Sequence, residues 1–213
     1  MNNNIEKLYE KYPLMKYRRL EYYTENKQNI EEEKKGIYDN YDEMGYSTIT
    51  KIINEIKDNI NNEDIFYDLG SGLGKVTTQF YLDTICKKVV GIEYFKDLFD
   101  VSIKVKKSIN IGKGRSIEYY QGNLINFDIY EATIIYFGVV NDKGAKLIEG
   151  DILKDIVIEK IKKSKNLKII ISLTPLDILY KKKIEKIYVP LKTKNGTIIK
   201  HKNYPFPHYI YYL

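Results

Sequence analysis

The chain has 213 residues, enough for one compact domain with a hydrophobic core, and its 43% hydrophobic and 30% charged residues are typical of a soluble globular protein. No apolar run approaches the ~20 residues of a membrane span, and the N-terminus lacks the apolar core of a secretion signal. The single cysteine, Cys86, excludes an internal disulfide, and together with only two histidines it excludes a zinc cluster. We therefore expect a reducing intracellular setting and no membrane partner.

The formal net charge of +6 is concentrated in residues 151–213, which hold 14 lysines against 5 acidic side chains. This basic third is either a surface for an anionic partner, such as non-specifically contacted DNA, or the solvated surface of a lysine-rich proteome. Lysine, asparagine, isoleucine and tyrosine are all abundant, and all four have AT-rich codons. The composition therefore indicates an AT-rich genome, such as that of a parasite, a microbe or a large DNA virus.

The N-terminal region is predicted to be a charged helical appendage over residues 1–35. Residues 36–46 are rich in Gly, Asp and Asn, which favours a loop. A helix is then expected over residues 47–56, with Ser47 as its N-cap because a serine hydroxyl accepts a hydrogen bond from a free helical amide. The inward face of this helix consists of isoleucines at helical spacing, Ile49, Ile52, Ile53 and Ile56.

Strands and helices alternate along the rest of the chain. Strands are predicted at residues 64–69, 87–93, 116–120, 132–140 and 167–173, and helices at residues 75–84, 95–108 and 151–163. Helices between apolar strands indicate a parallel sheet that is covered on both faces. Two last strand-like runs, 183–191 and 207–213, have no helix between them but contain the turn signal Asn195-Gly196, which predicts an antiparallel pair.

The segment "FYDLGSGLGK", residues 66–75, combines a strand, a glycine turn and the start of a helix. Its G-x-G-x-G spacing differs from the G-x-G-x-x-G of dinucleotide sites, and no Lys-Ser/Thr pair follows it as in a P-loop. Glu93 ends the next strand, where a carboxylate can accept both ribose hydroxyls of an adenosine. Asp68 can hold an amino or amide donor, although a tight turn with a core-facing Asp68 would have the same sequence.

This combination resembles the class I S-adenosylmethionine (SAM)-dependent methyltransferases. Within that class, four segments resemble the disruptor of telomeric silencing (Dot) family of non-SET histone lysine methyltransferases: "YDEMGYSTITKIINEI", "FYDLGSGLGKV", "KKVVGIE" and "YYQGNL". The later segments "ISLTPL" and "HYIYYL" are similar to that family's S-K-P-F segment and its Tyr-rich last strand. The resemblance covers residues 36–213. It implies a Rossmann-like α/β domain there, with a seven-stranded, mostly parallel sheet whose last strand is antiparallel.

The resemblance also implies a site and a reaction. SAM would be the cofactor, and the reaction would be in-line methyl transfer to a neutral lysine amine, with a core histone in the nucleosome as the expected substrate and the nucleus or a viral DNA site as the expected location. Tyr41 and Tyr209 would lie beside the substrate lysine, and Asn141 is a candidate for the side-chain amide near the reacting groups. The cofactor would be held by Tyr41, Asp42, Glu43, Met44, Asp68, Gly70, Ser71, Gly72, Gly74, Lys75, Glu93, Asn123 and Leu124.

The chain departs from the family pattern at three places. Asp42 stands where the family has glycine, the segment "YFGVV" at residues 136–140 replaces an Asn-Asn-Phe segment, and the family's long basic extension is missing, for which lysine-rich runs after residue 160 are possible substitutes. The alternatives are therefore another class I methyltransferase, acting on nucleic acid or a small molecule, and a SAM-binding scaffold without catalysis. His201 and His208 lie in no matched motif, and we expect surface or strand-end positions for them.

Overall fold

The protein is a three-layer α/β structure in the computed structural model, which describes residues 3–13, 44–138, 148–173, 175–176, 183–188 and 207–213. The strands are β1 (Ile65–Leu69), β2 (Lys88–Glu93), β3 (Ser116–Gln121), β4 (Ile134–Phe137), β5 (Ile169–Ser172), β6 (Lys183–Tyr188) and β7 (Pro207–Tyr212). The α-helices are α1 (Asn3–Tyr9), α2 (Tyr46–Ile56), α3 (Lys75–Asp83), α4 (Lys96–Lys106) and α5 (Ile148–Lys163), with short 3-10 helices η3 (Lys57–Asn59) and η4 (Leu124–Asn126). No described helix is long and apolar enough to cross a membrane.

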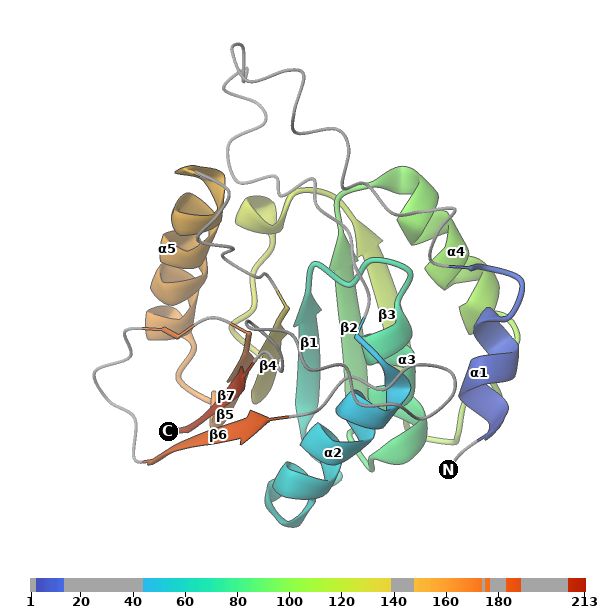
Figure 1. Ribbon diagram of the computed structural model, residues 1–213, viewed down its shortest axis with the longest axis horizontal. Helices are drawn as coiled ribbons and strands as arrows, with labels where there is room; N and C mark the ends of the chain where they lie inside the picture. The colour runs from blue at the N-terminus through green and yellow to red at the C-terminus, as the bar shows by residue number, and fades with distance from the viewer. Residues whose placement is uncertain (1–2, 14–43, 139–147, 174, 177–182, 189–206) are drawn as a thin grey trace.

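The strands form one seven-stranded sheet in the order β3-β2-β1-β4-β5-β7-β6 (Figure 1). β1 to β5 are parallel, and β7 runs antiparallel to both β5 and β6. The predicted fold class, a mostly parallel sheet with an antiparallel last strand, is therefore confirmed. The chain order reverses between β1 and β4, and ligands of such sheets bind at this switch point, beyond the carboxyl ends of the strands.

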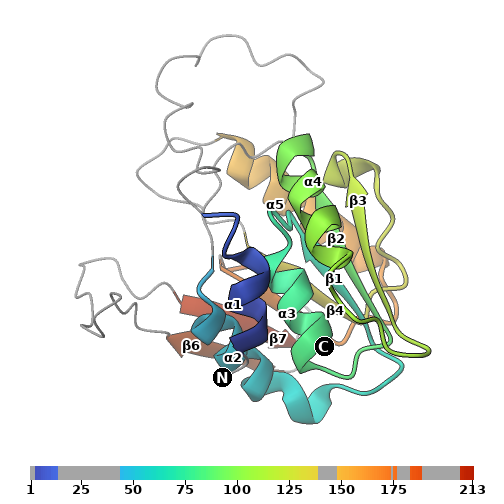
Figure 2. The same ribbon diagram turned by 90° about the vertical axis from the view of Figure 1, so that its right-hand side faces the viewer.

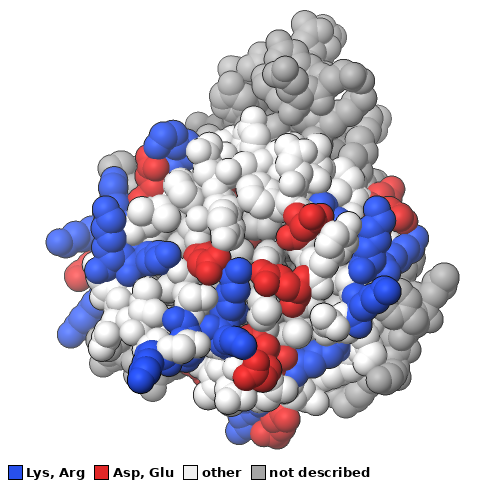
Figure 3. All heavy atoms as spheres, turned by 180° about the vertical axis from the view of Figure 1, so that it is seen from behind, with Lys and Arg blue, Asp and Glu red and all other residues white. Residues whose placement is uncertain are grey.

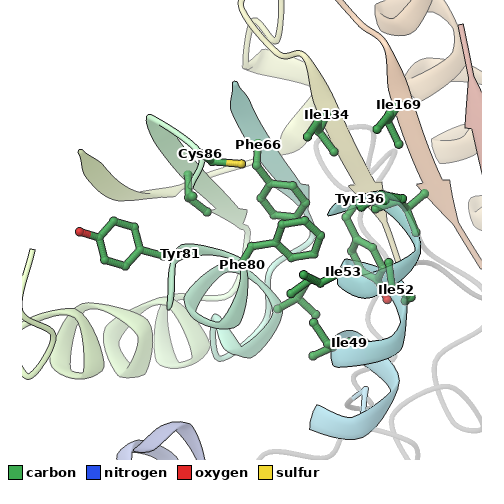
Figure 4. Close-up of a cluster of buried hydrophobic side chains, with 14 of the residues drawn as sticks. Ile49, Ile52, Ile53, Phe66, Phe80, Tyr81, Cys86, Ile134, Tyr136 and Ile169 are labelled. Atoms are coloured by element: carbon green, nitrogen blue, oxygen red, sulfur yellow. The ribbon is translucent and has the colours of Figure 1, made fainter. Parts of the chain in front are cut away.

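Side chains that alternate along the strands form a core on each face of the sheet. On one face the strands pack against α2 and α3, with Phe66 of β1 stacked on Phe80 of α3 at 3.8 Å between ring centroids (Figure 4). On the other face they pack against α5, where Val157 and Ile161 are buried. Cys86 is a fully buried member of the first core, as expected for a small apolar residue.

Helix α2 buries the four predicted isoleucines, which confirms its inward face. The expected cap is wrong, because the helix already begins at Tyr46 and Gly45 is its N-cap without a side-chain hydrogen bond. Ser47 therefore lies inside the first turn of the helix.

Helix α1 packs against α3 and α4 at the edge of the first face (Figures 1 and 2). Ile5 and Tyr9 are each only 3% exposed and share a core cluster with Leu73, Leu98 and Val101. The boundary that the sequence predicts at residue 35 lies outside the described residues. The start of the predicted appendage nevertheless contributes to the core of the α/β domain.

Candidate functional site

The glycine turn connects β1 to α3 at the carboxyl edge of the sheet. Gly70, Gly72 and Gly74 all have positive φ, at +87°, +54° and +82°. Residues with a side chain rarely adopt this left-handed region, whereas glycine adopts it at little cost. The turn closes with a hydrogen bond of 2.8 Å from the amide of Gly74 to the carbonyl of Ser71, and α3 begins at Lys75.

The first and third of these glycines have different surroundings. A Cβ placed on Gly70 would meet nothing within 4 Å, so the space beside this backbone is open. A Cβ on Gly74 would lie 2.7 Å from the ring of Tyr119 and 2.9 Å from Cβ of Ser102. Gly74 is thus needed for packing, whereas Gly70 leaves room for a ligand to approach the end of β1.

Glu93 fastens the glycine turn to the end of β2. Its Oε2 accepts a hydrogen bond of 2.7 Å from the amide of Gly72, and its Oε1 accepts one of 2.8 Å from the amide of Phe95. The carbonyl of Ile92 accepts two more bonds, from the amides of Gly70 and Ser71. The carboxylate is therefore fixed beside the turn by two backbone amides. The sequence did not predict the hydrogen bond between Glu93 and the amide of Gly72.

Asp68 at the end of β1 is held by the first turn of α3. Its Oδ2 accepts hydrogen bonds from Oγ1 of Thr77 at 2.7 Å and from the Thr77 amide at 3.2 Å. Burial raises the pKa of Asp68 to about 7, against the opposing effect of the Thr77 bonds, and the nearby charge of Glu93 raises it further. Thr77 is a second residue that the sequence reasoning missed, although it stands only nine positions after Asp68.

A series of hydrogen-bonded hydroxyl groups ends at the backbone of the turn. The hydroxyls of Tyr9 and Thr78 are hydrogen-bonded at 2.8 Å, and those of Thr78 and Tyr119 at the same distance. Tyr119 also donates to the carbonyl of Gly74 at 3.1 Å. One sequence signal was available for Tyr119: Gly91 lies inside strand β2, and an interior glycine often marks close approach of another group. A Cβ on Gly91 would lie 2.7 Å from the Tyr119 ring.

The remaining described cofactor candidates are Lys75, Met44, Asn123 and Leu124. Nζ of Lys75 lies 5.5 Å from the ring centroids of both Tyr9 and Tyr46. Met44 is partly buried against the core on the α2 face. Oδ1 of Asn123 accepts a hydrogen bond of 3.1 Å from the amide of Ile125, which caps η4.

Leu124, the last of the described candidates, is buried in the core on the α5 face. The predicted residues Tyr41, Asp42, Glu43 and Asn141 lie outside the described residues.

A SAM-like cofactor fits the turn on two observations. Oγ of Ser71 is buried and has no hydrogen-bond partner among the described residues, so a polar group is available at the centre of the turn. Gly70, beside which the space is open, follows the last residue of β1 at the switch point of the sheet. A donor-rich ligand with a ribose would meet Glu93 on one side and Asp68 on the other.

The β4 end of the site contains aromatic side chains. Tyr136 stands opposite Asp68 in the register of β4 and β1, and both are buried. Burial, together with the charge of Asp68, raises the pKa of Tyr136, so its hydroxyl stays neutral. The ring of Tyr136 comes within 2.8 Å of the Cβ position of Gly138.

Tyr209 of β7 pairs with Ser172 and packs against the core on the α5 face, whereas Tyr136 belongs to the core on the α2 face. Strand alternation places its neighbour His208 on the same face as Ile210, which belongs to the core on the α2 face. His208 is 2% exposed, and neither ring nitrogen has a hydrogen-bond partner among the described residues. Burial lowers the pKa of His208 to about 4. The histidine thus lies near a strand end, as expected, but is buried.

The family model for the histone methylation protein DOT1 matches residues 23–111. This match confirms the resemblance to the Dot family over those residues. No curated protein matches the chain.

Solved structures share the fold at low sequence identity. An RNA methyltransferase from Salinibacter ruber, in complex with S-adenosylhomocysteine (SAH), is 18% identical with a TM-score of 0.53, over 79% of this chain and 90% of that one. The methyltransferase domain of bacterial CtHen1 is 11% identical with a TM-score of 0.55, over 78% and 97%. A precorrin-6y C5,15-methyltransferase from Geobacter metallireducens is 14% identical with a TM-score of 0.51, over 78% and 86%. The chain therefore has the class I methyltransferase fold.

Proposed function

We propose that this chain is a SAM-dependent methyltransferase that transfers a methyl group to a protein lysine, with a core histone in the nucleosome as its substrate. The fold and the DOT1 family match over residues 23–111 support this proposal. We further propose that residues 36–213 form the catalytic domain. The observation that carries the cofactor assignment is Glu93, held at the end of β2 by the amides of Gly72 and Phe95 beside the open space at Gly70.

In this proposal the two carboxylates hold different parts of the cofactor. Glu93 accepts the ribose hydroxyls, as a carboxylate at the end of the second strand can. Asp68 accepts from an amino donor of the methionine part, a contact that favours its ionised form although burial raises its pKa to about 7. The loop residues Tyr41 and Glu43 would cover this part, and Asn123 and Leu124 would lie at the adenine.

The bound cofactor would supply an electrophilic methyl group on a sulfonium. The chain has to align a lysine amine with that methyl group and to exclude water. The lysine must also be neutral, although the usual pKa of its amine is ~10.4. An aromatic channel lowers that pKa by desolvation, and we assign its walls to Tyr41 and Tyr209, with Asn141 as the polar contact.

The lysine-rich C-terminal third is proposed as a sequence-independent contact to nucleosomal DNA. Lysine holds phosphate as a point charge, without the bidentate geometry of arginine. Among the described residues of this region, Lys162, Lys163 and Lys165 are exposed. On the face opposite to that of Figure 1, however, acidic side chains lie among the basic ones (Figure 3). We therefore expect a weak, strongly salt-dependent DNA contact.

Two measurements test the proposal. Isothermal titration calorimetry with SAM and SAH reports cofactor binding, and incubation with methyl-labelled SAM plus nucleosomes, free histones or RNA reports transfer. We expect label on histone lysines, located by mass spectrometry, and none with Gly70→Arg, because its side chain would fill the space at the end of β1.

Each other outcome of these measurements has a specific meaning. Label on RNA alone would refute the lysine assignment and favour a nucleic-acid methyltransferase. Binding of SAM without transfer to any acceptor would favour a non-catalytic scaffold. The absence of SAM and SAH binding would refute the cofactor assignment itself.

A further inference from the structure

Helix α1 lies outside the residues that match the DOT1 family model, yet it shares a core cluster with a residue of the glycine turn. Leu73, one of the residues of the turn, is fully buried in the same cluster as Ile5 and Tyr9 of α1. The buried leucine joins the turn to α1, while the glycines on either side of it have the left-handed backbone that shapes the turn. The apolar packing of α1 therefore stabilises the position of the turn as well as that of α4.

A polar path runs in parallel with this packing. The hydroxyl of Tyr9 is bonded to Thr78 at 2.8 Å, Thr78 to Tyr119 at 2.8 Å, and Tyr119 to the carbonyl of Gly74 at 3.1 Å. All three side chains are buried, so each hydroxyl depends on its neighbours for hydrogen bonds. Three segments that are far apart in the sequence thereby fix the carbonyl of the last glycine in the turn.

The ammonium group of Lys75, the first residue of α3, also lies near a side chain of α1. Nζ of Lys75 lies 5.5 Å from the ring centroid of Tyr9 and at the same distance from that of Tyr46. Aromatic faces attract an ammonium group at this range. Tyr9 therefore helps to hold the cation directly after Gly74, where the carboxylate of a bound amino-acid group would be attracted to it.

From this geometry we propose that α1 is a positioning element of the cofactor site, with Tyr9 as its positioning residue. Tyr9 acts on the turn through Thr78 and Tyr119, and it does not touch the cofactor. Docking of α1 and binding of the cofactor are then coupled, and by reciprocity each strengthens the other. The identity of the cofactor rests on the proposed function, whereas the coupling concerns this chain's own contacts.

The test compares Tyr9→Phe with the matched control Tyr12→Phe. Both changes remove one tyrosine hydroxyl next to the same core cluster, but only that of Tyr9 belongs to the polar path. We expect SAH to bind Tyr9→Phe roughly five-fold more weakly, the usual effect of one lost buried hydrogen bond. Tyr12→Phe should stay within about two-fold of the wild type.

A second pair of variants separates positioning from general stability. Thr78→Ser keeps the hydroxyl and should keep the wild-type affinity for SAH, whereas Thr78→Val should lose as much affinity as Tyr9→Phe. The double variant Tyr9→Phe/Thr78→Val should bind no more weakly than either single variant, because both changes break the same path. Hydrogen exchange gives the reciprocal readout: saturating SAH should slow exchange of the α1 amides in the wild type and have less effect in Tyr9→Phe.

The outcomes distinguish this proposal from the proposed function. If the wild type binds neither SAM nor SAH, the cofactor assignment and this proposal both fail. If the wild type binds SAH and Tyr9→Phe binds it equally well, α1 is not a positioning element although the cofactor assignment stands. If Tyr9→Phe and Thr78→Val lower the thermal unfolding midpoint without changing the SAH dissociation constant, their role is purely structural and the proposal is overturned.

Discussion

Two alanine substitutions in the glycine turn should separate cofactor binding from folding. In Gly70→Ala the new Cβ meets nothing within 4 Å, so the cost comes only from the positive φ of +87°. We estimate about 1–2 kcal/mol from the left-handed backbone. For a chain of this size that corresponds to a fall of roughly 2–8 °C in the unfolding midpoint. The methyl group would, however, stand in the space assigned to the cofactor.

Gly74→Ala should lower the unfolding free energy by the same backbone contribution and, in addition, by a steric one. Its Cβ would lie 2.7 Å from Cε1 of Tyr119, 2.8 Å from its hydroxyl and 2.9 Å from Cβ of Ser102. Overpacking of this kind costs about 1–3 kcal/mol, so the total is about 2–5 kcal/mol. Native domains are stable by only about 5–15 kcal/mol, and we therefore expect a marginally folded variant.

Urea unfolding and calorimetry with SAH measure the two effects separately. Gly70→Ala should remain folded but bind SAH at least about ten-fold more weakly, a loss of about 1.4 kcal/mol or more. Gly74→Ala should show its main loss in unfolding free energy. Normal SAH affinity in Gly70→Ala would place the cofactor elsewhere. Wild-type stability in Gly74→Ala would contradict the packing of Tyr119 against the turn.

Three further changes test the groups around the turn. Glu93→Gln should weaken SAH binding in calorimetry and lower the unfolding free energy by about 1–3 kcal/mol, because the amides of Gly72 and Phe95 lose a charged acceptor; an unchanged affinity would remove Glu93 from the ribose role. Thr77→Val should raise the pKa of Asp68 above its present value of about 7, seen as a shift of the carboxyl resonance in an NMR pH titration, because valine lacks the hydroxyl whose hydrogen bond to Asp68 lowers that pKa. Between pH 4 and 6.5 His208 binds a proton mainly in the unfolded chain, so its contribution to the unfolding free energy should rise with pH. Asp68 binds a proton mainly in the native chain, so its contribution should fall with pH. Each contribution changes by up to about 1.4 kcal/mol per pH unit. Urea unfolding of His208→Leu and Asp68→Asn across this range should give slopes that differ from the wild type in opposite directions, and parallel slopes would contradict both assignments.

The sequence predicted those parts of the site that depend on neighbouring residues and on the order of strands and helices. Asp68 and Glu93 each end a parallel strand, and parallel strands bring their carboxyl ends to one edge, so their proximity follows from the strand pattern alone. The positive φ of Gly70 and Gly74 follows in the same way from a tight strand-to-helix turn. Both inferences require only neighbouring residues and the order of the elements.

The contacts that the sequence did not predict join distant segments. Tyr9 and Thr78 are 69 positions apart, and Tyr119 reaches Gly74 across 45. Neither pairing follows from periodicity, because both depend on how α1 and β3 meet α3 in space. For His208 a signal did exist, because it shares the strand parity of Ile210, and a period of two places both on the buried face. Because histidine is polar, we expected a surface or strand-end position, but the side chain is buried.

The aromatic end of β4 bears on the departure from the family pattern. The resembled family carries an Asn-Asn-Phe segment where this chain has "YFGVV", and the ring of Tyr136 lies 2.8 Å from the Cβ position of Gly138. A side chain at position 138 would collide with that ring unless the ring moved, so Tyr136 of β4 and Gly138, which follows the strand, fit each other. Tyr136 lies on the face of the sheet that also carries Asp68. The face of the sheet that carries Asp68 therefore has a buried aromatic ring at this position, where the resembled family has side-chain amides.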